Sequence, residues 1–176
     1  ISVTFDSAGS AGEKVSVSAD GVSFEMVYVP GGLTFPTGNT DNGSATISEA
    51  YFIGETEVTY ELWQKVYDWA TVGTGAAAGE GQYSFQNAGR QGGNNVGGPV
   101  GTGLHPVTTL YWRDSMVWCN ALTEWYNAQI GTHYECVYTF DDGGGPEIIR
   151  DSQDGNAAAC DGAAAGSTAT DFRLLT

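Results

Sequence analysis

The chain of 176 residues carries twenty-one acidic side chains against six basic ones, which gives a formal net charge of −15 at pH 7. Such an acidic surface repels nucleic acid and anionic lipid, because it has few cations to replace phosphate counterions. Hydrophobic residues at 41% and aromatic residues at 12% exclude disorder for most of the chain. No stretch approaches the roughly 20 apolar residues of a membrane helix. We therefore expect a folded domain that neither binds nucleic acid nor inserts into a membrane.

Charged residues make up only 15% of the chain, below the roughly 25% of an average soluble domain. Gly, Ser, Thr and Asn must supply the remaining polar surface, a composition typical of secreted bacterial proteins and surface layers. The sequence starts at Ile1, without a basic segment followed by an apolar run, which suggests a processed or trimmed product. We expect an extracellular or cell-surface protein of bacterial origin.

Alternating apolar and polar residues predict β-structure in the first third of the chain. Residues 1–23 alternate around Gly and Ser and predict a short β arm outside the main domain. Residues 24–36 predict a strand that ends in a Pro-Gly turn. Residues 46–55 predict another strand after a polar loop.

The apolar period then lengthens to three or four residues, which is the period of an amphipathic helix. This spacing predicts one helix over residues 59–71 and a second near residues 112–127, followed by a strand over residues 134–140. Gly-rich segments at residues 72–103 and 141–170 lack periodicity. Loops this long are either functional or ordered covers of the core. Two helices among short strands and long loops predict an α+β domain.

Several segments, taken in order, resemble the formylglycine-generating enzyme (sulfatase-modifying factor) family. Residues 24–32, Phe-Glu-Met-Val-Tyr-Val-Pro-Gly-Gly, are similar to its opening strand. Residues 52–59, Phe-Ile-Gly-Glu-Thr-Glu-Val-Thr, are similar to the segment before its first helix. The remaining matches are His-Pro-Val at residues 105–107, Trp-Arg-Asp at 112–114, Cys-Asn-Ala-Leu at 119–122 and Arg-Leu-Leu-Thr at 173–176.

The resemblance implies a C-type-lectin-like fold over residues 24–176, with residues 1–23 as the added β arm. It also implies that the domain is cut short at its C-terminal end, since the copper-binding cysteine pair and the calcium ligands of the family lie in later segments. Tyr111 stands where the family usually has a Ser that caps the second helix, and Leu175 stands in place of a Pro. We therefore assign no catalytic residue.

Three cysteines are present. Cys136 lies in a predicted strand and Cys160 in the loop that follows, so a disulfide between them would stabilise the fold of an exported protein by about 3 kcal/mol. Two reduced thiols are the alternative. Cys119 lies on the apolar face of the second predicted helix, where we expect a buried side chain.

The acidic loops offer oxygen ligands for calcium at Asp141, Asp142, Asp151 and Asp154. None of these loops matches a known calcium motif, and solvated turn carboxylates are the competing interpretation. No Cys or His pair has the spacing of a zinc or copper site, so we predict no site for either metal.

Five tryptophans fall mostly in the predicted helices, where packing in the core is the default. Trp63 and Trp118 are the two that we predict could be exposed to stack on a carbohydrate. Together these features favour a secreted or cell-surface, non-catalytic binding or structural module that assembles with a protein partner or with itself through its long loops. The alternative is the front half of a formylglycine-generating oxidase whose catalytic cysteines lie on another segment.

Overall fold

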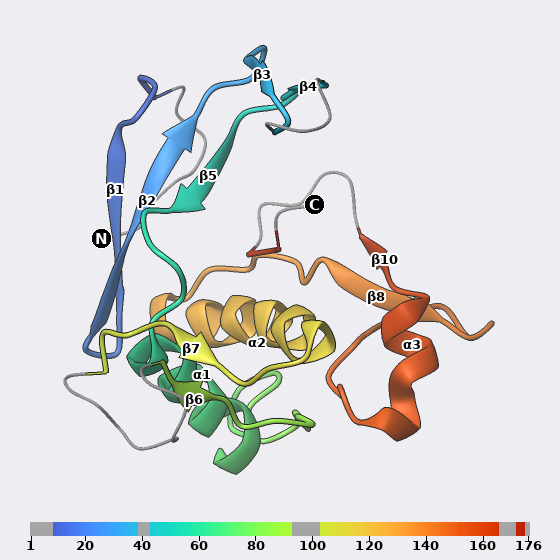
Figure 1. Ribbon diagram of the computed structural model, residues 1–176. Coiled ribbons are helices and arrows are strands. Elements are labelled where there is room, and N and C mark those ends of the chain that lie inside the picture. Colours follow the sequence, from blue (N-terminus) through green and yellow to red (C-terminus); the bar gives the residue numbers. More distant parts are fainter. Residues whose placement is uncertain (1–8, 39–42, 93–102, 166–171, 175–176) are drawn as a thin grey trace. The chain divides into compact units, whose positions relative to one another are not determined.

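The computed structural model describes residues 9–38, 43–92, 103–165 and 172–174 (Figure 1). Parts of the predicted N-terminal arm, of both long loops and of the final Arg-Leu-Leu-Thr match lie outside these residues. The chain forms two compact units, Ile1–Glu57 and Val58–Thr176. Their described residues form small antiparallel sheets and three α-helices, which confirms the predicted α+β class. No helix in the described part of the chain is long and apolar enough to span a membrane.

The first unit is built on an antiparallel sheet of strands β1 (Lys14–Ala19), β2 (Val22–Val29) and β5 (Tyr51–Gly54), in the order β1-β2-β5. Asp20 and Gly21 join β1 to β2 in a tight turn with positive φ at both residues. The predicted boundary between an arm and a domain, after residue 23, falls inside β2. Residues 14–19 therefore form a strand of the same sheet as the family-like segment.

The predicted Pro-Gly turn follows β2 and leads into a hairpin of β3 (Thr34–Pro36) and β4 (Ser44–Thr46). Gly32 has φ +83°, a value that glycine adopts without steric cost. A Cβ on Gly31 would lie 2.8 Å from the Ser48 carbonyl oxygen, so the two backbone segments approach too closely for a side chain. The predicted strand over residues 46–55 is instead two strands, β4 and β5.

The second unit begins with helix α1 (Tyr60–Val72), close to the predicted range. The Thr59 hydroxyl accepts a hydrogen bond of 3.3 Å from the Leu62 N–H and caps the helix. Its buried face consists of Leu62, Trp63, Val66 and Ala70.

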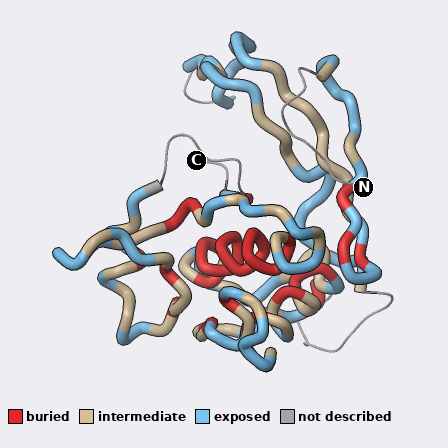
Figure 2. Tube along the Cα trace, turned by 180° about the vertical axis from the view of Figure 1, so that it is seen from behind, coloured by how far each residue is buried: buried red, intermediate tan, exposed pale blue. Residues whose placement is uncertain are grey.

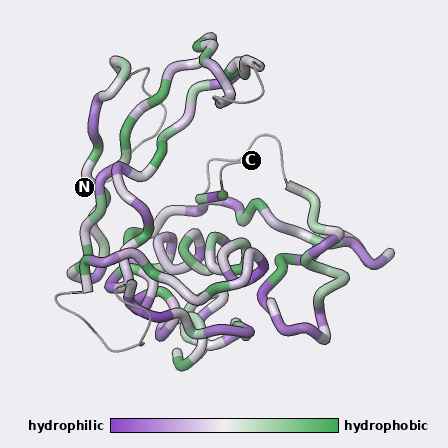
Figure 3. The backbone as a smooth tube through the Cα atoms, in the orientation of Figure 1, coloured by the Kyte–Doolittle hydropathy of each residue, from purple (hydrophilic) through white to green (hydrophobic). Residues whose placement is uncertain are grey.

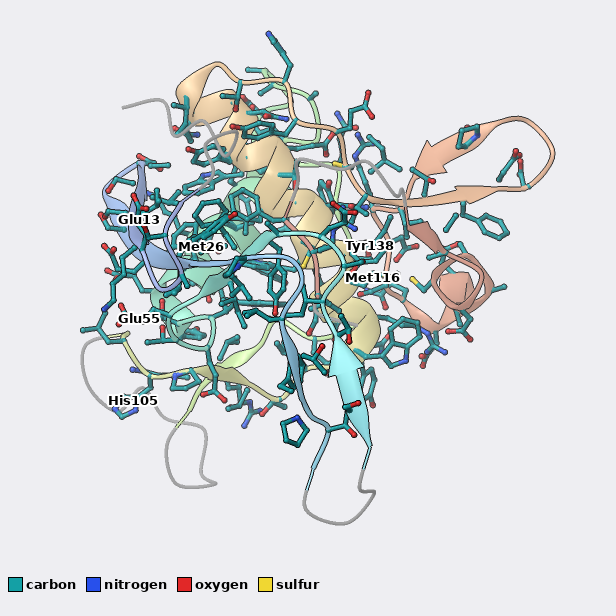
Figure 4. The ribbon with its side chains drawn as sticks, turned by 90° about the horizontal axis from the view of Figure 1, so that it is seen from above. Glu13, Met26, Glu55, His105, Met116 and Tyr138 are labelled. Atoms are coloured by element: carbon teal, nitrogen blue, oxygen red, sulfur yellow. The ribbon has the colours of Figure 1, made fainter. Side chains whose placement is uncertain are left out.

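Helix α2 (Trp112–Ile130) forms the core of the second unit and is three residues longer than predicted. Twelve of its residues are buried, and Figure 2 shows most of its length in red. Contacts reach it from α1, from strand β8 (Tyr138–Asp141) and from α3 (Ala157–Asp161). Met116 of α2 and Tyr138 of β8, both buried, are labelled in Figure 4. Because α2 is covered on several sides, its buried polar side chains must find their hydrogen-bond partners inside the protein.

The described parts of the two long loops pack on this core. Residues 73–92 include β6 (Arg90–Gln91), which pairs with β7 (Val107–Thr108), and they bury Tyr83 and Phe85. The Tyr83 N–H donates to the Ala70 carbonyl of α1. Of the two alternatives that the sequence left open, these contacts favour an ordered cover for the described part of this loop.

The second loop adds strands β9 (Pro146–Ile148) and β10 (Ala164–Ala165) on either side of β8, and a short 3-10 turn, η1 (Asp154–Asn156), before α3. The hairpin between β8 and β9 ends in a hydrophilic tip, drawn in purple in Figure 3. The loop also buries Ile149 and Cys160.

Strand β8 starts four residues later than the predicted strand because the Asn127 side chain holds the preceding backbone. Asn127 Oδ1 accepts the Tyr134 N–H at 2.9 Å and the Thr132 hydroxyl at 2.9 Å, and its Nδ2 donates to the Tyr134 carbonyl at 2.8 Å. These bonds satisfy the backbone locally, so no strand partner is required there.

Candidate functional site

The polar residues that match the family motifs converge on helix α2. Asp114 and Asn120 are both completely buried, with no exposed surface. Buried polar groups are costly unless each one finds partners, so the bonds that they make define what these residues do.

The Asp114 carboxylate accepts five hydrogen bonds, all from neutral donors. The donors are the backbone N–H groups of Gln86, Asn87 and Tyr111, the Asn87 side-chain amide and the Ser152 hydroxyl, at 2.5–3.3 Å. The bond from the Tyr111 N–H also caps α2 from inside the helix, which explains why the helix begins without a Ser at that position. Asp114 thus joins the start of α2 to both long loops.

Asn120, six residues further along α2, holds the start of β8. Its Nδ2 donates to the carbonyls of Tyr138 and Ile149 at 2.8 and 3.0 Å, and its Oδ1 accepts the Tyr138 N–H at 3.2 Å. The side chain therefore fastens the backbone of Tyr138 and Ile149 to α2.

A third buried group, Glu124, pairs with Arg150 and Tyr83. Arg150 donates to both carboxylate oxygens, at 3.0 and 2.5 Å, and the Tyr83 hydroxyl donates to Oε2 at 2.5 Å. These hydrogen bonds raise the pKa of the Arg150 guanidinium, and burial raises the pKa of Tyr83 well above its ordinary value. Burial therefore keeps the Tyr83 phenol neutral at physiological pH, and the contacts of the Glu124–Arg150 ion pair are internal.

Trp63 and Trp118 are not available for stacking on a ligand, contrary to our expectation. Their exposed fractions are 1% and 3%, and their rings stack on each other with centroids 5.1 Å apart. Trp63 Nε1 donates to the Ala88 carbonyl at 2.8 Å, and Trp118 Nε1 donates to the Trp63 carbonyl at 3.3 Å. Both are core residues that fasten residues 73–92 and α1 to α2.

The predicted disulfide between Cys136 and Cys160 is not formed. Cys136 donates to the Asn120 carbonyl at 3.5 Å, whereas Cys160 donates to the Asp151 carbonyl at 3.4 Å. The two sulfurs are thus directed to backbone groups in different parts of the unit. Cys119 is buried on α2, as expected.

The four aspartates that we considered as calcium ligands do not form one cluster. Asp141 accepts the N–H groups of Gly143 and Gly145 at 2.8 and 2.9 Å, which lowers the pKa of its carboxyl group. Asp142 accepts the Gly144 N–H, and Asp151 accepts the Gln153 N–H. Asp154, on η1, is exposed. Among the described residues no group of three or more Cys, His, Asp or Glu side chains could hold a metal ion.

Two aromatic rings that the sequence did not single out are exposed in place of Trp63 and Trp118. Tyr111 and Trp112, at the start of α2, are 55% and 54% exposed. The sequence contained one signal for this. An Asp three residues after Tyr111 can accept a hydrogen bond at the start of the helix, so the side chain of residue 111 is not needed as a cap. His105, labelled in Figure 4, is also exposed.

No family model and no curated protein match this sequence. Solved structures that are similar to it include the following two. Treponema denticola variable protein 1 is 28% identical with a TM-score of 0.59 over 93% of this chain, and CarF is 25% identical with a TM-score of 0.60 over 87%. The chain spans 53% of each of those proteins. Both have formylglycine-generating-enzyme-like or C-type-lectin-like folds, which is the likeness that the sequence motifs indicated.

Proposed function

We propose that this chain is a non-catalytic binding or assembly module on a formylglycine-generating-enzyme-like scaffold, displayed at the surface of a bacterial cell or secreted from it. One observation carries the proposal. The polar side chains that match the family motifs, Asp114 and Asn120, spend their hydrogen-bonding capacity inside the fold. Residues that hold a backbone in place this way serve as structural anchors, and the bonds they make are to the fold and not to a substrate.

The chemistry of the remaining groups supports the same proposal. Nucleophilic catalysis by a thiol requires an accessible thiolate, whereas Cys119 and Cys160 are buried and burial raises the pKa of Cys160. Glu124, Arg150 and Tyr83 form hydrogen bonds with one another inside the fold. A general acid or base must reach a substrate, so this set suits a role in holding a loop in place.

The alternative function is the front half of an oxidase whose catalytic cysteines are supplied by another segment. The chain spans about half of each similar structure, and this coverage is the observation that favours the alternative. The two functions differ in one respect that can be measured, which is whether the native protein oxidises a cysteine substrate.

A location and assembly experiment tests the leading proposal on material from the natural source. Protease added to intact cells should release peptides of this chain, since a displayed module is accessible from outside. Chemical cross-linking before lysis, followed by mass spectrometry, should join the chain to a partner protein or to another copy. Protection of the chain until lysis, together with cross-links only within one chain, would contradict the proposal.

A further inference from the structure

Two large aromatic side chains are exposed at the start of α2 although the fold does not need them there. Tyr111 and Trp112 each expose more than half of their surface. The Tyr111 N–H donates to the Asp114 carboxylate at 2.9 Å, so this bond at the start of α2 uses the backbone of Tyr111 and not its ring. Exposed aromatic surface of this kind marks a site of interaction when polar groups surround it.

Trp112 is held in place before any partner arrives. The Arg113 guanidinium lies 5.5 Å from the centre of the Trp112 ring. Arg113 itself donates to both carboxylate oxygens of Asp161, at 2.9 and 3.0 Å. A ring fixed by this chain of contacts loses little conformational freedom on binding, which lowers the cost of association.

Two exposed carboxylates lie next to Arg113, the residue whose guanidinium contacts the Trp112 ring. The side chains of Asp161 and Asp154 are 52% and 75% exposed, and Asp154 lies 4.0 Å from Arg113. Arg113 supplies one positive charge against these two carboxylates, and the whole chain carries −15. Aromatic faces attract cations, and carboxylates in the neighbourhood strengthen this preference.

We propose that the aromatic–acidic surface, formed by Tyr111, Trp112, Asp154 and Asp161, binds a basic protein segment that presents Arg or Lys side chains. This inference rests on the proposed function and names the class of partner for it. A neutral carbohydrate could also stack on the two rings, but the excess negative charge of the surface would add nothing to its binding. The charge therefore decides for a cationic partner.

A titration with defined peptides tests the inference. A short fluorescent peptide of alternating Gly and Arg is added at an ionic strength of about 0.15 M, where distant charges are screened. Trp112→Ala should weaken binding about fivefold, the effect of losing one cation–π contact of roughly 1 kcal/mol. Phe35→Ala, which removes an aromatic ring 46% exposed in the other unit, should change the affinity by less than about twofold.

A charge control separates local recognition from general attraction to an acidic protein. Asp154→Asn should weaken peptide binding more than Asp141→Asn, although both remove one exposed carboxylate. In the unmodified protein, the indole N–H resonance of Trp112 should shift on addition of the Arg peptide and stay in place with a matched Glu peptide. This second measurement does not depend on the folding of any variant.

Equal effects of Trp112→Ala and Phe35→Ala would overturn the inference, as would a Trp112 resonance that responds to a neutral oligosaccharide but not to the Arg peptide. The proposed function would survive either result if cross-linking still identified a partner at another surface. If cross-linking found no partner while the peptide bound at Trp112, the assembly proposal would fail and the surface assignment would stand.

Discussion

The Ser152 hydroxyl donates a 2.5 Å hydrogen bond to the buried Asp114 carboxylate, across 38 positions of sequence. The same hydroxyl accepts the Gln86 N–H at 3.0 Å, and that N–H also reaches Asp114. A helix start and two long loops are therefore joined at one point.

Replacing Asp114 should destabilise the second unit more than any surface change. In Asp114→Asn an amide group that donates would face backbone N–H groups that also donate, and buried donors would lose their acceptor. We expect a loss of about 3 kcal/mol in the free energy of unfolding, measured by urea denaturation. The matched control, Asp154→Asn, alters a carboxylate whose side chain is 75% exposed and should stay within about 0.5 kcal/mol. A loss below about 1 kcal/mol for Asp114→Asn would mean that the carboxylate is not an anchor.

Gly79 should resist substitution because its backbone lies directly against Glu124. It has φ +80°, and a Cβ built on it would lie 2.0 Å from Glu124 Oε2. Gly131 has a similar φ of +75° at the end of α2, but a Cβ there would meet nothing within 4 Å. Gly131→Ala should therefore cost about 1 kcal/mol for backbone strain alone, and Gly79→Ala at least about 2 kcal/mol more. Equal losses in thermal or urea unfolding would contradict the close contact.

Thiol labelling should find three reduced cysteines that differ in reactivity. Cys136 is partly exposed, whereas Cys119 and Cys160 are buried, so Cys136 should react first in the folded protein. The Cys160 pKa is raised by burial, which slows its reaction further. In denaturant without reductant all three thiols should be labelled. If only one were labelled, Cys136 and Cys160 would be joined, as the sequence analysis expected.

The ion pair between Arg113 and Asp161 should stabilise the fold at neutral pH and lose its effect in acid. The hydrogen bond from Arg113 lowers the pKa of the Asp161 carboxyl below its ordinary 3.8. A group with a lowered pKa contributes stability above its unfolded pKa, and that contribution falls as pH drops through the folded value. The wild type and Asp161→Asn should thus differ in urea midpoint at neutral pH, and this difference should disappear below about pH 4.

Added salt provides the control for this prediction, because the Asp161 side chain is 52% exposed and its pairing is screened. High salt at neutral pH should reduce the same difference in midpoint. A difference that is independent of both pH and salt would show that Asp161→Asn acts through packing and not through charge.

Local patterns in the sequence predict the helices well and the attachments between them poorly. The apolar spacing predicts α1 to within one residue at each end, because a helix that covers a core must repeat every three to four residues. The buried face of α1 includes Trp63, which we expected could be exposed, together with Ala70.

The errors at the cysteines and at the loops have a different origin. Whether Cys136 and Cys160 can bond depends on the direction of two side chains, which no spacing determines. Likewise, the loop composition gave no sign that Tyr83 and Ser152 would each reach a carboxylate of α2. Such contacts join residues roughly forty positions apart and are set by tertiary packing.

The most direct test of the central claim, that this scaffold is not catalytic, is an oxidation assay on the chain as it occurs in its natural source. The protein is supplied with copper, oxygen and a peptide that carries the cysteine motif of a sulfatase, and the peptide mass is followed with and without the protein. We predict no conversion of the cysteine to formylglycine above the rate without protein. Conversion that depends on the protein would contradict the account and would identify the chain as part of an oxidase.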